Sequence, residues 1–151
     1  MEVETDRFTV AVFQDVVWAR KGLDALTQAG FPAESLTIIG KESPELGALA
    51  EQSLGPGSGR LELPSVGAVV ARGPLVDALQ GSAGDLTKLG LAGTMRRVGF
   101  QTHDGQIFET LTARGGVLVA IRSEPRAADA LAILHSYGGG NAAVGAWTGR
   151  V

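Results

Sequence analysis

Two histidines, His103 and His135, are the side chains best suited to acid–base or metal chemistry in this sequence. His103 precedes Asp104, but adjacent residues point apart in most backbone conformations, so we expect Asp104 to cap a helix and His103 to lie in a loop. His135 falls in the last turn of an expected helix, where the helix dipole favours a cation. Because a metal site needs several converging ligands and the chain has no cysteine, we predict neither a metal centre nor a cofactor.

The glycine-rich segment 55–59, Gly-Pro-Gly-Ser-Gly, is the second candidate for chemistry. A phosphate-binding loop needs a strand before it, a helix after it and a Lys-Ser/Thr pair or a full glycine fingerprint. No helix start follows at Arg60, so the segment is predicted to be a flexible turn or linker. Gly40 and Lys41 lack the upstream glycine of such a loop, and Ser58 lies outside a Gly-x-Ser-x-Gly element. We therefore predict no catalytic residue.

Charged side chains offer two further clusters. Glu42 and Glu45 flank an expected helix start, where negative charge is stabilising. Four arginines of the C-terminal half suggest an anion site, but the charge of that half is roughly balanced, which favours solvated helix ends. These arginines are Arg96, Arg97, Arg114 and Arg122.

Two tryptophans and two glycine-containing turns, one Gly-Pro and one Gly-Gly, complete the candidates. Trp18 and Trp147 are predicted to be core or interface anchors, and either one would stack a ligand if exposed. Gly73–Pro74 and Gly115–Gly116 are places where the backbone would approach a ligand closely.

Composition limits the classes of function. The 151 residues allow a single domain with its own core, and their net charge of −3 shows no electrostatic footprint for nucleic acid. The acidic start, residues 1–6, does not resemble a secretory signal. The most apolar stretch, residues 66–79, is interrupted by Arg72 and Asp77, which argues against stable membrane insertion. We expect a cytoplasmic protein.

Two β–α–β units are expected at the ends of the chain. The first, residues 8–40, follows a flexible tail at 1–7, and the second covers residues 117–147. The units correspond at an offset of 108 residues, which aligns three apolar helix positions and the glycine that ends each helix. The aligned pairs are Ala19 with Ala127, Leu23 with Leu131, Leu26 with Leu134, and Gly30 with Gly138.

The segment between them, residues 41–116, is expected to be a glycine-rich and mostly helical insertion. Helices are predicted from Ser43 to about Ser53, after Gly73–Pro74, over 85–98 and after Asp104, with one extra strand at 66–71. Two β–α–β units in one sheet predict an α+β, ferredoxin-like split βαβ sandwich within a single domain, 8–151. Right-handed crossovers place both helices on one face, so the insertion or a second subunit must cover the other.

The order of several motifs resembles the general stress protein 17M-like (YflT-type) domain family over roughly residues 8–147. The motifs are Thr-Val-Ala-Val-Phe at 9–13, Leu-Thr-Ile-Ile-Gly-Lys-Glu at 36–42, and the segment 108–121 that ends in Gly-Gly-Val-Leu-Val-Ala-Ile. The resemblance implies a bacterial, cytoplasmic, stress-associated protein of unknown activity, with no catalytic residues to transfer.

Two hypotheses about function follow. The first is a non-enzymatic, stress-associated protein that acts through self-assembly, as a dimer or higher homo-oligomer, or through contact with another protein. The alternative is a small-metabolite-binding regulatory domain, with a ligand site between subunits or at the insertion. An unrecognised enzyme would require a pocket that joins His103, Asp104 and an arginine.

Overall fold

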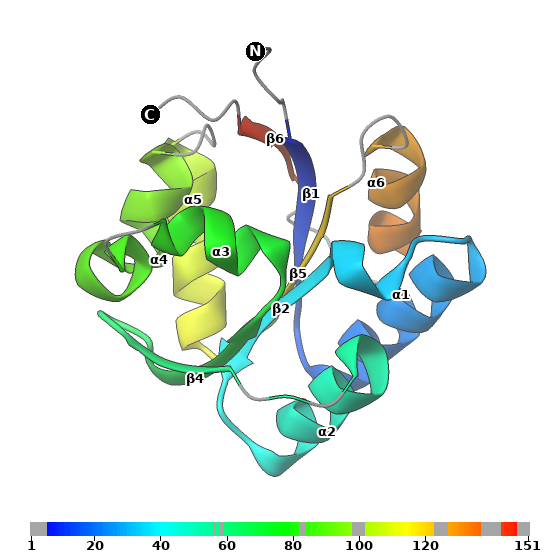
Figure 1. Cartoon of the computed structure of the whole chain (residues 1–151), viewed down its shortest axis with the longest axis horizontal. Helices are drawn as coiled ribbons and strands as arrows, with labels where there is room; N and C mark the ends of the chain where they lie inside the picture. The colour runs from blue at the N-terminus through cyan, green and yellow to red at the C-terminus, as the bar shows by residue number, and fades with distance from the viewer. Residues whose placement is uncertain are drawn as a thin grey trace.

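A computed structural model describes residues 6–55, 57, 59–81, 84–97, 102–122, 127–136 and 143–147. Its central sheet lies between two layers of helices (Figure 1). The elements are β1 (Asp6–Phe13), α1 (Val16–Gln28), a short 3-10 turn (Ala33–Ser35), β2 (Leu36–Lys41), α2 (Pro44–Leu54), β3 (Arg60–Leu63), β4 (Gly67–Arg72), α3 (Pro74–Gln80), α4 (Asp85–Arg97), α5 (Thr102–Ala113), β5 (Val117–Arg122), α6 (Ala127–Ser136) and β6 (Ala143–Trp147).

The sheet has six strands in the order β3-β4-β2-β5-β1-β6, and each pairing is antiparallel. The strands of the two β–α–β units alternate, because β5 lies between β2 and β1 while β1 lies between β5 and β6. The predicted α+β class is therefore confirmed.

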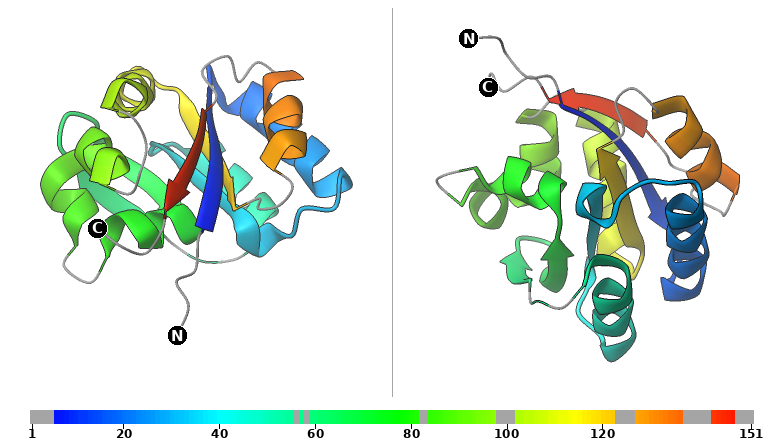
Figure 2. Two further views of the ribbon diagram at one scale, coloured as in Figure 1. Left: turned by 90° about the horizontal axis from the view of Figure 1, so that it is seen from above. Right: turned by 45° about the vertical axis from the view of Figure 1, so that its right-hand side comes forward.

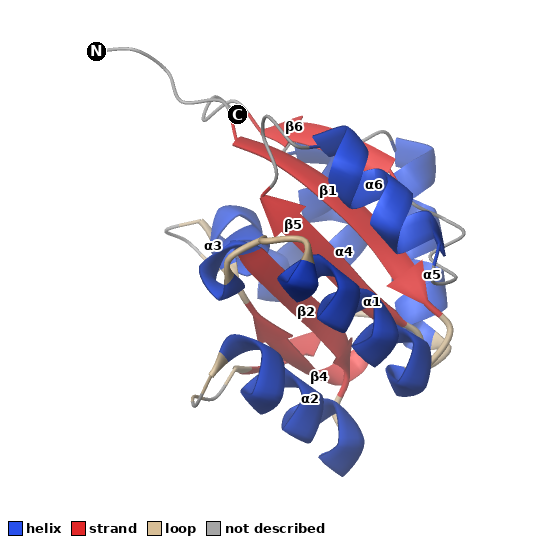
Figure 3. Cartoon of the chain, turned by 90° about the vertical axis from the view of Figure 1, so that its right-hand side faces the viewer, coloured by secondary structure: helices blue, strands red, loops and turns tan. Residues whose placement is uncertain are grey.

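Both faces of the sheet are buried. On one face, α1, α2 and α6 cover side chains such as Phe13, Val119 and Ile121. On the other face, α3, α4 and α5 cover side chains such as Val10 and Leu118. Figures 2 and 3 show these two layers on opposite sides of the strands. Consecutive residues of a strand face opposite sides of the sheet. Because both sides are covered by helices, β1 and β5 carry unbroken apolar runs.

The repeat predicted at an offset of 108 residues matches the structure. Shifting β1, α1 and β2 by that number places them over β5, α6 and β6 within a few residues at each end. Leu26 and Leu134 belong to the same core, so the two crossover helices lie on one face as expected. Gly30 ends α1 with φ of 96°, and the amide of Phe31 donates to the carbonyl of Leu26 at 3.1 Å, which is the pattern of a Schellman cap.

The prediction of a ferredoxin-like sandwich is not confirmed. The six-strand order is not the ferredoxin-like one, because β4 and β3 extend the sheet beyond β2. The insertion also supplies the second helical layer. Of the two ways to cover the second face, the structure uses the chain itself, because the insertion brings enough leucine and aromatic side chains to bury it.

The insertion begins as predicted and then departs from the prediction. Ser43 caps α2 by accepting a hydrogen bond from the amide of Leu46 at 3.1 Å. The strand β3 was not expected, and β4 and α3 follow where strand and helix were expected. The start of α3 has no local cap; instead Thr37 Oγ1, on β2, accepts from the amide of Leu75 at 3.0 Å.

The helix predicted over 85–98 contains a break. Gly90 has φ of 84° and ψ of 175°, which no α-helix contains, so α4 consists of two short helical pieces. After this break the core side chain is Leu91, whereas Leu89 is 57% exposed. Glu109 of α5 accepts from the amide of Ala92 at 2.9 Å and so caps the second piece.

The bounds at three other places were only partly predicted. The strand β1 begins at Asp6, so residues 6–7 belong to the strand and not to a tail. The helix α5 begins at Thr102, which places His103 in its first turn, not in a loop, and Asp104 after the cap position. The expected start of the last helix at 123–125, its end at 138–140 and residues 1–5 lie outside the described residues. No helix in the described ranges is long and apolar enough to cross a membrane.

Candidate functional site

Of the histidines and arginines singled out from the sequence, those with described side chains lie at the ends of three different elements. His103 is exposed on the first turn of α5, and Arg122 is exposed at the end of β5. Arg96 and Arg114 are also exposed, near the ends of α4 and α5. The side chains of the other three candidates lie outside the described part of the chain: they are Arg97, His135 and Trp147. Among the described residues, no group of three or more His, Cys, Asp or Glu side chains could hold a metal ion.

The glycines expected near a ligand, Gly73 and Gly116, approach other parts of the chain instead. A Cβ at position 73 would lie 2.5 Å from the Cα of Thr37 on β2. A Cβ at position 116 would lie 2.8 Å from the carbonyl oxygen of Leu111. Gly115, with φ of 101°, ends α5 in a second Schellman cap, in which the amide of Gly116 donates to that same carbonyl. These close approaches are therefore uses of glycine in the fold itself.

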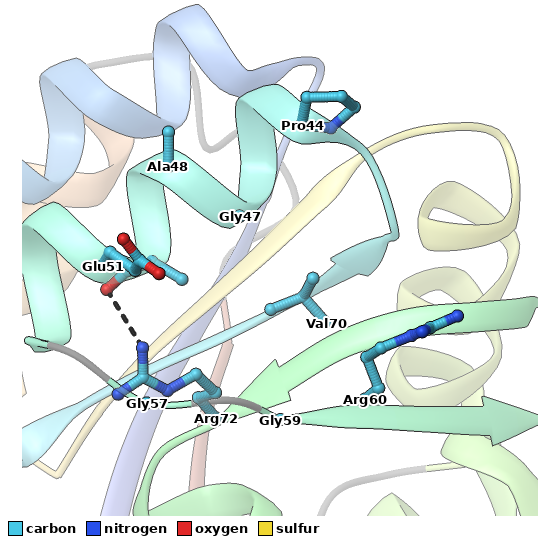
Figure 4. A pocket seen from close by; sticks show the side chains of 10 residues that line it. Pro44, Gly47, Ala48, Glu51, Gly57, Gly59, Arg60, Val70 and Arg72 are labelled. Carbon is cyan, nitrogen blue, oxygen red and sulfur yellow. Dashed lines mark hydrogen bonds between the residues drawn. The ribbon is translucent and has the colours of Figure 1, made fainter.

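A cavity of about 340 Å³ lies between α2 and the strands β3 and β4 (Figure 4). Its described walls all belong to the insertion. An apolar floor of alanine, proline and valine meets a margin with two arginines and one glutamate. The lining consists of Pro44, Gly47, Ala48, Ala50, Glu51, Gly57, Gly59, Arg60, Val70 and Arg72.

One stripe of α2 forms the helical wall of this cavity. Pro44, Gly47, Ala48 and Glu51 occupy positions i, i+3, i+4 and i+7, which share one face of a helix. A Cβ at Gly47 would meet nothing within 4 Å. The cavity therefore owes part of its space to small residues on α2.

The glycine-rich segment forms another wall and is packed against β4. A Cβ at position 57 would lie 2.9 Å from a terminal nitrogen of Arg72, and one at position 59 would lie 2.5 Å from the carbonyl oxygen of Ala71. The amide of Ala71 donates to the carbonyl of Gly59 at 2.7 Å. At Gly57 and Gly59 the backbone therefore approaches its neighbours too closely for side chains, which a linker without contacts would not require. Ser58 lies outside the described residues.

Arg72 joins α2 to the sheet. Its Nη1 donates to the carbonyl of Gly55 at 2.9 Å and to that of Ala50 at 3.4 Å. These carbonyls lie at the C-terminal end of α2, where a cation is favoured by the helix dipole. The guanidinium is thereby held in one orientation at the margin of the cavity (Figure 4).

Arg60 lies at the opposite end of the cavity and is more exposed. Its Nε lies 2.7 Å from Glu42 Oε2, and the two side chains are 69% and 36% exposed. An ion pair this exposed contributes about 0–1 kcal/mol to stability. Glu51, near Arg72, supplies the negative charge of the lining.

The chain has a second cavity, of about 410 Å³, on the outer side of α5. Its described lining consists of His103, Gln106, Ile107, Thr110 and Leu111. Among its described lining residues, His103 is accompanied by neither Asp104 nor an arginine.

Trp18 is exposed at the start of α1 rather than buried in the core. It is 36% exposed and its neighbour Val17 is 61% exposed. The ammonium of Lys21, one turn later, lies 4.4 Å from the centre of the indole ring, within cation–π range. Trp18 is therefore not a core anchor, which was one of the uses predicted for it.

The sequence reasoning missed the α2–β4 cavity. Arg72 was noted as an interruption of an apolar stretch and Arg60 as the end of a linker. One signal was available, because Arg60-Leu61-Glu62-Leu63 alternates charged and apolar residues with the period of a strand. A strand there would have placed the glycine-rich segment at a sheet edge.

We compared the chain with protein-family models, curated proteins and solved structures, and none of the three comparisons found a match.

Proposed function

We propose that this chain is a non-enzymatic domain that binds a small molecule in the cavity between α2, β3 and β4. The observation that carries the proposal is the cavity itself: about 340 Å³, open on one side and lined by the insertion, with an apolar floor and a charged margin. Ligand sites in proteins commonly combine a concave apolar surface with a few polar groups, in volumes of roughly 300–1,000 Å³.

Filling the cavity tests this proposal. Gly47→Leu places a side chain in the empty space beside α2, whereas Gly47→Ala adds one methyl group with nothing within 4 Å. We expect at least one compound from a set of amino acids, organic acids, sugars and nucleotides to raise the Tm of the wild type and of Gly47→Ala but not of Gly47→Leu. A set in which no compound shifts the wild-type Tm would contradict the proposal.

Self-assembly is the second candidate, and one observation favours it. Val17 and Trp18 are adjacent apolar side chains exposed at the start of α1, and exposed aromatic residues are frequent in interfaces. The covered sheet faces contribute nothing to this candidate. Light scattering over micromolar concentrations should show a homodimer or a larger assembly that the double change Val17→Ser and Trp18→Ser converts to monomers. A wild type that is monomeric throughout would contradict it.

We also propose that the two β–α–β units form a ferredoxin-like core to which β4 and β3 were added. The inner order β2-β5-β1-β6 supports this, because each unit places its two strands on either side of one strand of the other. Backbone NOEs from β1 to both β5 and β6 are expected, and their absence would contradict the proposal.

A cytoplasmic, stress-associated role in a bacterium remains part of the proposal and rests on the family resemblance. Cell fractionation and measurement of the protein level after heat shock test it. A constant level under stress, or recovery of the protein outside the cytoplasmic fraction, would contradict it.

A further inference from the structure

We propose that the α2–β4 cavity takes a small organic acid, whose anionic group binds beside Arg60 while its apolar part lies against Val70. This inference rests on the proposed function and adds the chemical class of the ligand. It uses the charges of the lining, the arrangement of the two arginines and the nature of the floor.

The lining carries more positive than negative charge. Arg60 and Arg72 supply two guanidinium groups, and Glu51 supplies one carboxylate. A guanidinium is a planar fork of N–H donors that matches the two oxygens of a carboxylate or phosphate group. Because Glu42, outside the lining, pairs with Arg60, the preference for an anion rests on these N–H donors and not on net charge.

The two arginines differ in how far their side chains are held by the fold. Arg72 is held by the carbonyls of Ala50 and Gly55, so its charge is fixed in place before a ligand arrives. Arg60 has its Nε beside Glu42, and its side chain is 69% exposed. Arg60 is therefore the arginine that can offer two N–H donors to an arriving acid group.

The floor selects for an apolar body on the ligand. Val70 is 8% exposed and belongs to the core beneath α2, and Figure 4 shows its side chain between the two arginines. Ala48 and Pro44 continue this apolar surface along α2. A ring or short branched chain would cover these groups.

Four probes of one shape test the charge class. Benzoate and phenyl phosphate are the anions, benzamide is the neutral analogue and benzylamine is the cation. We expect either anion to bind the purified protein with a Kd at least about tenfold lower than that of benzamide or benzylamine, as expected for a charge-assisted contact. The tighter of the two anions then identifies the acid group. Benzamide or benzylamine binding as tightly as both anions would overturn the inference.

Two charge variants locate the contact, with one matched control. Arg60→Gln should raise the Kd of the bound anion about tenfold. Glu51→Gln removes the opposing carboxylate and should lower that Kd about two- to fivefold. Glu45→Gln makes the same change on α2 outside the cavity lining and should leave the Kd within about twofold. An unchanged Kd in Arg60→Gln, with an unaltered unfolding curve, would overturn the inference.

The same variants separate failure of this inference from failure of the proposed function. If a neutral or cationic compound binds and Gly47→Leu abolishes its binding, the cavity is a binding site but its ligand is not an acid. A protein that binds none of the four probes and no compound of the broader set rejects both.

Discussion

The two helical layers of this protein begin their helices in different ways. In the layer that contains α1 and α2, Asp15 and Ser43 accept from amides three residues later, at 3.0 and 3.1 Å. In the other layer, the start of α3 and that of the second piece of α4 take their acceptors from other elements, namely Thr37 of β2 and Glu109 of α5. At these described starts, α1 and α2 carry their helix signals in the local sequence, whereas α3 and the second piece of α4 depend on other elements of the fold.

Glycine brings elements close together in both layers. An added Cβ at Gly22 of α1 would lie 2.6 Å from the ring of Phe13 on β1, and Gly73 fits α3 against the backbone of β2. The layers differ inside their helices, where Gly47 leaves open space on the surface of α2, whereas Gly90 interrupts α4.

The largest expected effect comes from closing the contact at Gly73. Gly73→Ala would bring a Cβ against the carbonyl of Leu36 and the Cα of Thr37 at a φ of 125°, and should lower the free energy of unfolding by about 3 kcal/mol. Gly67→Ala is the control, because φ there is 98° but nothing lies within 4 Å; it should cost about 1–2 kcal/mol. Urea denaturation measures both. Equal losses would show that strain at positive φ, and not packing of α3 on β2, decides the cost.

Removing the distant cap of α3 should have the next largest effect. Thr37→Val keeps the shape of the buried side chain but leaves the amide of Leu75 without its acceptor, which should cost about 2 kcal/mol. Ser43→Ala, which removes a local and partly buried cap, should cost about 1 kcal/mol. Both values come from chemical denaturation. A larger loss for Ser43→Ala would contradict the greater dependence of the second layer on its distant caps.

Alanine in place of glycine should change stability in opposite directions in the two layers. Gly47→Ala lies inside a regular helix with open space around it and should gain about 0.5–1 kcal/mol. Gly90→Ala must adopt φ of 84° and should lose about 1–2 kcal/mol. Thermal unfolding followed by circular dichroism gives both signs. A gain in Gly90→Ala would mean that α4 is continuous in solution.

The smallest effect is expected at the margin of the cavity. Arg60→Gln breaks an exposed ion pair with Glu42 and should change the free energy of unfolding by less than about 0.5 kcal/mol. The same denaturation series measures it. A loss above about 1 kcal/mol would assign Arg60 a role in the fold and weaken its use as a binding residue.

Helices with local caps were predicted better from the sequence than helices that are capped by other elements. The helices α1 and α2 were predicted from the apolar positions 19, 23 and 26 and from the helix start at Ser43, since such signals act over one or two turns. The break at Gly90 was missed. The carboxylate that caps the piece after this break belongs to Glu109, 17 residues from Ala92, and no local pattern contains it.

The candidate site was also predicted only where its residues are close together in the sequence. Its glycine-rich wall was noticed in the sequence, but Arg60, Arg72 and the small residues of α2 were not connected with it. They meet because β3 pairs with β4 and because α2 packs over Val70, and both contacts join residues that are distant along the chain.

The sequence by itself determined the two β–α–β units, their repeat at 108 residues and the end of the first helix at Gly30, because hydrophobic period and capping act between near neighbours. Only the tertiary structure decided that β3 and β4 extend the sheet beyond β2 and that the insertion buries the second face of the sheet. It also decided that a cavity remains beside α2. These features depend on strand pairing and close packing across the chain, whose partners are chosen only when the whole core forms.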